Sequence, residues 1–256
     1  MIVQVESSAM DHRQARGRSI GSLLLLSTLA LSGCLSEREK AVRRLLESRE
    51  CVGCDLTGAV LEDANLEGVN LSNAKLENAK LARARIRNAN LTDAILTRAD
   101  AQGADLRGAQ LSGTYLENVQ LQRANLEGTD LRTVRALESA NLEGANLRGI
   151  NLEGGALYGV AGPYDRSETS HAYDVPSGGA LVMRADLGGA KLRAATLARC
   201  NFEGAILKGA DLRDANLEGS NLKDVDWQDA LLAGSTWADG SECGAGSVGS
   251  CRPVKR

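Results

Sequence analysis

An apolar residue, usually leucine, recurs at every fifth position from Leu56 almost to the C-terminus. If this position is called i, the residue at i−2 is small, most often alanine, and positions i−1, i+1 and i+2 are mostly polar, charged or glycine. A period of five fits neither the helical period of 3.6 residues nor the strand period of two. Such a short, fixed period predicts a repeat architecture in which each unit turns one large and one small side chain inward.

The sequence Ala-Asn-Leu-Glu-Gly occurs at 64–68, 124–128, 140–144 and 215–219, with close variants between. These residues resemble the Ala-(Asp/Asn)-Leu-X-X motif of the pentapeptide-repeat family over roughly three quarters of the chain. The resemblance implies an all-β fold, a right-handed quadrilateral β-helix with four units per coil. Because one coil cannot bury its leucines alone, stacked neighbouring coils would create the core.

Two irregularities interrupt the first part of the repeat. Ala101 stands where a leucine is expected, which predicts a thinner interior at that coil. Leu131 and Leu137 are six residues apart, so one additional residue lies within 132–136. A bulge is the simplest way to absorb a single inserted residue.

The period predicts two repeat blocks, 55–157 and 182–237, separated by an insertion at 158–181 across which the repeat phase is unchanged. A C-terminal cap is expected over 238–256. The end of the second block carries aromatic residues, which predict a widened or closing terminal coil: Phe202, Trp227 and Trp237.

Residues 1–33 resemble a lipoprotein-type signal peptide. A basic stretch containing Arg13 to Arg18 precedes an apolar run, Ile20 to Leu31, which is short for a membrane span. Leu31-Ser32-Gly33-Cys34 resembles the bacterial lipobox, which implies that Cys34 becomes the lipidated first mature residue. A buried hairpin and a plain membrane anchor remain alternatives, and translation could start at Met1 or at Met10.

Lipidation of Cys34 predicts a protein tethered to a membrane of the cell envelope by its acyl chains and facing the periplasm. Leu35, and not aspartate, follows the cysteine. By analogy with lipoprotein sorting, this favours the outer membrane in a cell that has one.

Residues 36–50 predict a helix within a tether and cap region, 34–54. Ser36 and Glu39 have the spacing of a capping box. Val42, Leu45 and Leu46 form one apolar stripe. Because a solenoid exposes unpaired strand edges at its ends, the helix is a candidate N-terminal cap. The alternative is a charged spacer to the membrane.

The cysteines differ in position. Cys51 and Cys54 precede the first repeat, and Cys243 and Cys251 follow the last. In an exported protein, these pairs predict two structural disulfides, and both patterns resemble those of exported pentapeptide-repeat proteins. A zinc site, a redox C-x-x-C motif and pairing between chains are the alternatives. Cys200 lies at an i−2 position and is expected to be buried and reduced.

Basic and acidic residues nearly balance, with 30 Lys and Arg against 33 Asp and Glu. The family resemblance implies DNA mimicry as an alternative function, in which columns of acidic side chains occupy the DNA site of gyrase. Here the column Glu67, Arg87, Arg107, Glu127 mixes signs. The mixed charge and the export signal disfavour that function, and we expect no nucleic-acid partner.

The 158–181 insertion concentrates residues that are rare elsewhere in the chain, which makes it a candidate interaction loop. Its candidate residues are Tyr158, Tyr164, Asp165, His171, Tyr173 and Asp174. An ordinary packed loop is the alternative. A catalytic or metal site around His171 has little support, because one histidine is a weak ligand set.

No nucleophile–base–orienter set and no phosphate-binding loop appear in the sequence. We therefore expect a non-enzymatic structural or protein-interaction scaffold, without cofactor, metal or catalytic residues. Its expected partners are the membrane, through Cys34, and a protein. A homo-oligomer, joined end to end or face to face, is a further expected form of assembly.

Overall fold

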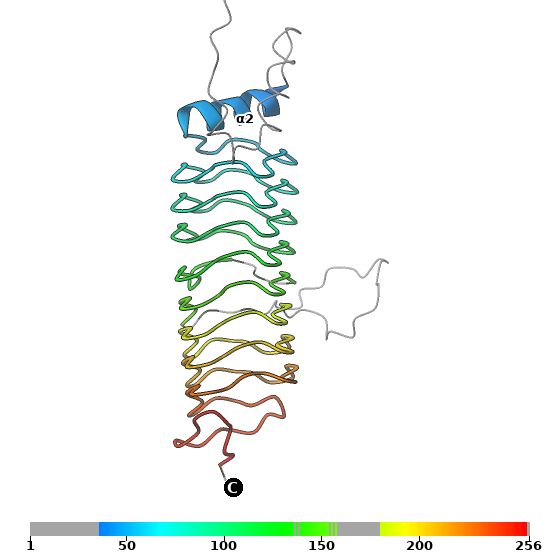
Figure 1. Cartoon of the computed structure of the whole chain (residues 1–256). Coiled ribbons are helices and arrows are strands. Elements are labelled where there is room, and N and C mark those ends of the chain that lie inside the picture. Colours follow the sequence, from blue (N-terminus) through cyan, green and yellow to red (C-terminus); the bar gives the residue numbers. More distant parts are fainter. Residues whose placement is uncertain are drawn as a thin grey trace, which may run out of the picture. The chain divides into compact units, whose positions relative to one another are not determined.

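The computed structural model describes residues 36–135, 137, 139–153, 155, 157 and 180–254. The chain divides into two units, Met1–Cys34 and Leu35–Arg256, and all described residues belong to the second. One helix lies among them, α2, Glu37–Ser48. The rest of this unit is joined by isolated β-bridges rather than by continuous strands (Figure 1).

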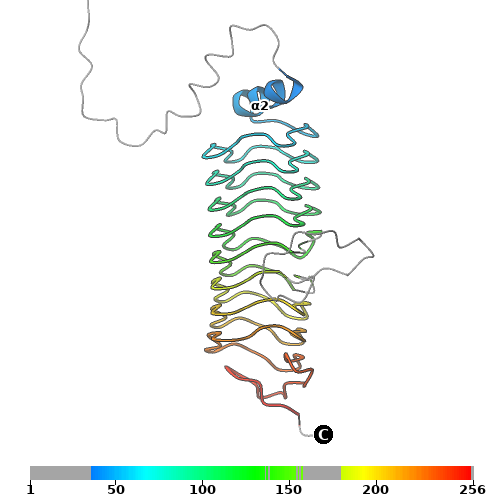
Figure 2. The ribbon, with the colours of Figure 1, turned by 90° about the vertical axis from the view of Figure 1, so that its right-hand side faces the viewer.

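Parallel bridges join residues that lie twenty positions apart, as in Glu50 to Asn70 and Asn70 to Asn90. Four five-residue units therefore complete one coil, which confirms the predicted count. The leucine N–H of each unit donates to a carbonyl of the next coil; that of Leu56, for example, donates to the Lys75 oxygen at 2.8 Å. Figures 1 and 2 show the coils stacked, with α2 at the N-terminal end of the stack.

A tight turn follows each inward leucine and explains why bridges stay isolated. The Ala59 N–H donates to the Leu56 carbonyl at 2.9 Å. Gly58, between them at i+2, has a φ of 63°. Where the position carries a side chain, as at Asn78, φ is 56°. A positive φ at the third turn residue favours glycine and asparagine, as the repeat shows.

Asparagine and aspartate at i−1 have a structural task that sequence reasoning missed. The Asn65 side-chain oxygen accepts a hydrogen bond from the Glu67 N–H at 3.1 Å, and Asn125 does the same for Glu127 at 3.1 Å. The side chain thereby satisfies a turn N–H that points away from the bridge ladder. This local bond accounts for the preference for Asn or Asp before the leucine.

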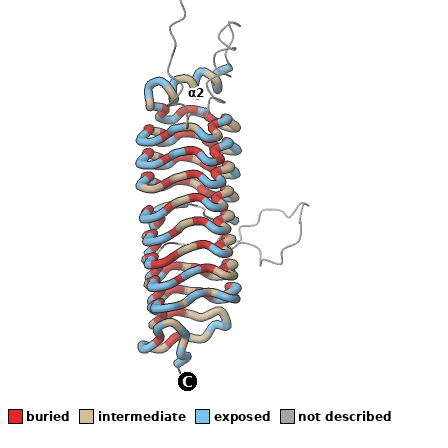
Figure 3. The backbone as a smooth tube through the Cα atoms, viewed as in Figure 1, coloured by how far each residue is buried: buried red, intermediate tan, exposed pale blue. Residues whose placement is uncertain are grey.

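The i and i−2 side chains form the core. Figure 3 colours the buried residues red, and they recur along the stacked coils. Ala101 is fully buried at its leucine position. Four hydroxyl side chains take the small i−2 position without leaving a buried donor unpaired: Thr114, Thr129, Ser220 and Ser235. Thr114 donates to the Leu91 carbonyl at 2.8 Å, and Ser220 donates to the Leu197 carbonyl at 2.7 Å.

The bridge offsets locate both interruptions. Tyr115 pairs with Arg135 twenty residues on, whereas Gln120 pairs with Asn141, twenty-one residues on. One residue is therefore inserted after Arg135, in agreement with the predicted 132–136 segment. Asn141 then pairs with Leu181, forty residues on, so the insertion adds the length of one coil without shifting the repeat phase.

The N-terminal helix forms as predicted and ends slightly earlier. The Ser36 hydroxyl accepts from the Glu39 N–H at 3.2 Å, and the Glu39 carboxylate accepts from the Ser36 N–H at 2.7 Å. Leu45 is fully buried in the core, with Val42 and Leu46 partly buried against it. The helix stops at Ser48 because Arg49 adopts a φ of 63°, which turns the chain into the first coil.

The C-terminal segment folds back on the last coil through antiparallel bridges, Leu231 with Val248 and Thr236 with Glu242. Trp227 and Trp237 lie there, with ring centroids 5.0 Å apart, in agreement with a closing coil. For Phe202 the prediction was wrong. This ring is fully buried in an ordinary coil. The Phe202 N–H still donates to the Asn221 carbonyl of the next coil, so the coil interior holds a phenyl group without widening the stack.

Both predicted disulfides are present, Cys51–Cys54 and Cys243–Cys251. The first links two residues at the start of the first coil, and the second closes a loop in the C-terminal segment. Cys200 is free and buried. Closing the longer loop stabilises by about 2–3 kcal/mol in the chain-entropy model.

We expect the double substitution Cys243→Ser and Cys251→Ser to lower the free energy of unfolding by about that amount, because the unfolded C-terminal segment regains its freedom. A denaturant titration measures the loss. Addition of reductant should cost the wild type more than the double variant, because the variant has only the Cys51–Cys54 disulfide left to lose. A disulfide that involves Cys200, found by non-reducing peptide mapping, would contradict the pairing.

Candidate interaction surface

Most of the predicted functional residues lie outside the described part of the chain. The lipidation candidate Cys34 is among them. So are the candidate loop residues Tyr158, Tyr164, Asp165, His171, Tyr173 and Asp174. What the structure does describe is the frame of the insertion: the Ala180 N–H donates to the Leu157 carbonyl at 3.2 Å. This is the bond that closes an ordinary turn, so the insertion begins and ends at one corner of the coil.

Cys200 is the one free cysteine of the described chain. Burial raises the pKa of its thiol to about 12. The group is therefore protonated at neutral pH and is a poor nucleophile. The backbone N–H of Cys200 donates a hydrogen bond to the Ser220 hydroxyl at 3.0 Å.

A corner of the stack carries an alternation that sequence reasoning missed. At one of the four i+2 columns, arginine and glycine alternate over six described coils. The order is Arg83, Gly103, Arg123, Gly144, Arg184 and Gly204. The alternation continues across both the one-residue insertion and the long insertion. The other three i+2 columns show no such regularity.

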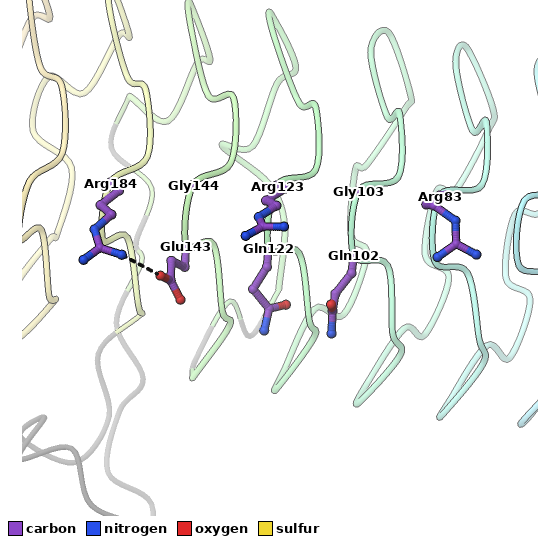
Figure 4. Close-up of a pocket in the computed structure, with 8 residues that line it drawn as sticks. All are labelled: Arg83, Gln102, Gly103, Gln122, Arg123, Glu143, Gly144 and Arg184. Carbon is purple, nitrogen blue, oxygen red and sulfur yellow. Dashed lines mark hydrogen bonds and ion pairs between the residues drawn. The ribbon is translucent and has the colours of Figure 1, made fainter.

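The alternation creates a hollow along this corner. The stem of each arginine lies over the glycine of the next coil: a Cβ at Gly103 would be 3.6 Å from Arg83 Cγ, and one at Gly144 would be 3.7 Å from Arg123 Cγ. The hollow has a volume of about 590 Å³. We call it the corner groove, lined by Arg83, Gln102, Gly103, Gln122, Arg123, Glu143, Gly144 and Arg184 (Figure 4).

The three arginines of the corner groove differ in their ion pairs. Arg83 donates two hydrogen bonds to Asp63, at 2.8 and 2.7 Å, and this contact lowers the pKa of Asp63. Arg184 lies 3.5 Å from Glu143. Arg123, between them, forms no ion pair with any described residue. Arg123 is therefore the arginine of the groove that has no charged partner among the described residues.

Amide side chains lie beside the arginines in a second row (Figure 4). Gln122 Nε2 donates to Gln120 Oε1 at 3.0 Å, which fixes the orientation of the amide. Gln122 Oε1 is buried and has no hydrogen-bond partner among the described residues. A buried acceptor without a partner costs about 1–3 kcal/mol, so it favours an incoming donor.

Elsewhere on the described surface, several arginines pair with an aspartate two residues earlier in the chain. Arg107 donates to Asp105 at 2.8 and 2.6 Å, and this contact lowers the pKa of Asp105. Arg213 and Asp211 repeat the arrangement, with the same effect on the pKa of Asp211. The predicted column that contains Glu67, Arg87, Arg107 and Glu127 is thus mixed in sign.

Two searches of the described residues were negative. They contain no helix that is both long and apolar enough to cross a membrane. They also contain no cluster of three or more His, Cys, Asp or Glu side chains arranged to hold a metal ion.

Comparison with known families assigns the repeat. The model of the pentapeptide repeats matches residues 54–93, 94–132 and 185–235, in 8 copies. These ranges make up just over half of the chain. The chain belongs to the pentapeptide-repeat family. No curated protein matches this pentapeptide-repeat protein.

Solved structures of the same fold resemble it. HetL from Nostoc sp. strain PCC 7120, involved in heterocyst differentiation regulation, is 28% identical, with 75% of this chain and 86% of HetL covered and a TM-score of 0.43. Trypsin-treated QnrB1, a plasmid-mediated fluoroquinolone resistance protein, is 20% identical, with 71% and 81% covered and a TM-score of 0.45. Rfr23 from Cyanothece 51142 is 20% identical, with 77% and 97% covered and a TM-score of 0.21.

Proposed function

We propose that this pentapeptide-repeat protein is a non-enzymatic interaction scaffold of the cell envelope, tethered to a membrane through lipid on Cys34. The observation that carries the scaffold role is the division of labour among its side chains. Leucines and alanines build the core, and Asn and Asp at i−1 accept hydrogen bonds from turn N–H groups, so these positions serve the fold. The outward-facing side chains of the coils then form a regular surface that is available for binding, with a disulfide at each end of the repeat region.

The alternative function, a gyrase-type mimic of DNA, would need columns of unpaired acidic side chains. Some acidic groups, such as Asp105 and Asp211, are bonded to arginines, and the column that contains Glu67 and Arg87 mixes signs. The one strongly patterned corner carries arginine. Both observations favour the scaffold over the DNA mimic.

The tether rests on the sequence of residues 13–34, and it has a direct test. We expect mass spectrometry of the protein purified from its own cells to find a mature N-terminus at Cys34 that carries acyl chains. Cys34→Ala should move the protein out of the membrane fraction, because about 0.8 kcal/mol per buried methylene is lost with the chains. Cys200→Ala is the matched control and should stay membrane-bound. An unmodified N-terminus upstream of Cys34 would refute the tether.

The scaffold role is tested by crosslinking in the intact envelope. Crosslinks from the native protein to one recurrent protein partner support it. The Cys34→Ala variant, assayed alongside, separates the two parts of the proposal: capture that survives loss of the anchor keeps the interaction role and limits the tether to localisation. Crosslinks to random neighbours in proportion to their abundance would oppose a specific interaction role.

A further inference from the structure

We propose that the corner groove binds an extended acidic peptide in the polyproline II conformation, with a carboxylate at every third residue. The inference rests on the scaffold role proposed above, since it names the surface and the partner chemistry. It does not depend on the lipid anchor. Four observations carry it: charge, spacing, the hollow between the arginines and the unsatisfied amide.

The charge of the groove selects an anion. Its lining contains three arginines and one glutamate, whereas the whole chain has a net charge of −3. Arg123 forms no ion pair with a described residue, and the side chain of Arg184 is 73% exposed beside Glu143 at 3.5 Å. An exposed pair of this kind contributes little, so a ligand carboxylate can replace or share it. Arg83 keeps donors to spare, because a guanidinium has five N–H groups and Asp63 takes two.

The spacing of the arginines selects the conformation of the ligand. Arg83, Arg123 and Arg184 lie two coils apart, which is about 9.6 Å at a coil spacing of about 4.8 Å. A polyproline II helix rises about 3.1 Å per residue with three residues per turn, so the same face recurs every 9.3 Å or so. Three carboxylates at i, i+3 and i+6 would span about 19 Å, the distance from Arg83 to Arg184 on this spacing.

Other peptide conformations fit less well. In an extended strand, residues three apart point to opposite faces. An α-helix returns to nearly the same face after seven residues, about 10.5 Å, and would drift by about 2 Å over the length of the groove. An α-helix is also about 10–12 Å wide, whereas the hollow is bounded by arginine stems that lie over single glycines.

The amide row suits a peptide backbone. A polyproline II helix has no internal hydrogen bonds, so its N–H and C=O groups are free to bond outward. Gln122 Oε1 is buried and has no partner among the described residues, so a turn of its amide toward the groove is needed before it can accept one such N–H. Gln102 occupies the equivalent position one coil earlier and offers both a donor and an acceptor (Figure 4).

The test uses two labelled peptides of identical composition, (Glu-Pro-Pro)₄ and the block sequence Glu₄-Pro₈, with fluorescence anisotropy at low salt. Only the first places its carboxylates on one face at the arginine spacing. We expect it to bind the full chain about tenfold more tightly than the block peptide. Equal binding of the two would reduce the groove to a general attraction between charges and would overturn the proposal.

Matched variants assign the binding to the groove. Arg123→Asn should weaken (Glu-Pro-Pro)₄ binding about tenfold, and Glu143→Gln should strengthen it about threefold by freeing Arg184. Arg98→Asn is the control: Arg98 has a φ of 59°, close to that of Arg123 at 58°, but lies at another corner. Asparagine already occupies this turn position elsewhere, at Asn78 and Asn118 for example, so both variants keep the backbone.

Three results would overturn the inference: no binding of (Glu-Pro-Pro)₄, equal losses in Arg123→Asn and Arg98→Asn, or tighter binding of polygalacturonate, which would assign the groove to an anionic polysaccharide. The crosslinking experiment keeps the two proposals apart. If the envelope partner is still captured by Arg123→Asn, the groove assignment falls and the scaffold role stands.

Discussion

Leu106→Ala should lower the free energy of unfolding by about 2–5 kcal/mol, the range for truncating a buried leucine. Leu106 is 3% exposed and points into the stacked interior. The interior position before it in the chain is already small, because Ala101 stands there. The new cavity would therefore border a methyl group, which has little volume to move into it. Denaturant titration followed by circular dichroism measures the loss.

The matched control is the next residue in the chain. Arg107 points outward, with its side chain 39% exposed and bonded to Asp105. A partly exposed pair of this kind contributes at most about 1 kcal/mol, so Arg107→Ala should cost far less than Leu106→Ala. Equal losses for the two variants would contradict the assigned inward face.

Much of this fold could be predicted because each unit is specified locally. A leucine, a small residue two positions earlier and a turn residue two positions later are enough to set one side of a coil. The capping box at Ser36 and Glu39 is equally local, and it formed as predicted. Since the period fixes which residues face inward, the core followed almost entirely from the sequence.

The corner groove could not be recognised from single units, because it depends on how units stack. Arg123 and Arg184 fall in one column, two coils apart, only after the one-residue and the long insertions are placed. The signal was nevertheless present in the sequence. The mixed-sign column of Glu67, Arg87, Arg107 and Glu127 lies at i+1 in the first block, whereas the alternation lies at i+2 and extends into the second. The position of Phe202 was misjudged for a related reason, since composition alone does not say how much room a coil interior has.

The turn at Gly58 and Asn78 shows why the surface is less predictable than the core. Both residues have a positive φ, and arginine also adopts it, for example at Arg83. In this chain the positive φ therefore does little to decide whether glycine, asparagine or arginine stands at this position. Selection of arginine and glycine in strict alternation is not required by the fold, which supports a functional origin for the pattern.

Replacement of residues 158–179 by the dipeptide Glu-Gly should preserve the fold, and it tests whether the candidate loop or the corner groove makes the partner contact. The closure restores an uninterrupted repeat, Leu157-Glu-Gly followed by Ala180. The structure supports the join, because the Ala180 N–H already donates to the Leu157 carbonyl at 3.2 Å, as in an ordinary turn. The coils on either side are also in register, since Asn146 pairs with Asp186 and Asn151 with Lys191.

The expected free energy of unfolding of this variant is within about 1 kcal/mol of wild type, or slightly higher, because a shorter loop costs less closure entropy. A second variant, with a Gly/Ser segment of the original length, separates the side chains from the length of the loop. If the tyrosines and charged residues of the insertion make the contact, both variants lose crosslinking to the envelope partner and both keep their thermal transition. Capture that survives in both would place the contact on the repeat faces, with the corner groove as the first surface to test. A marked loss of stability in the Glu-Gly variant alone would show that the insertion is needed to hold the two repeat blocks together.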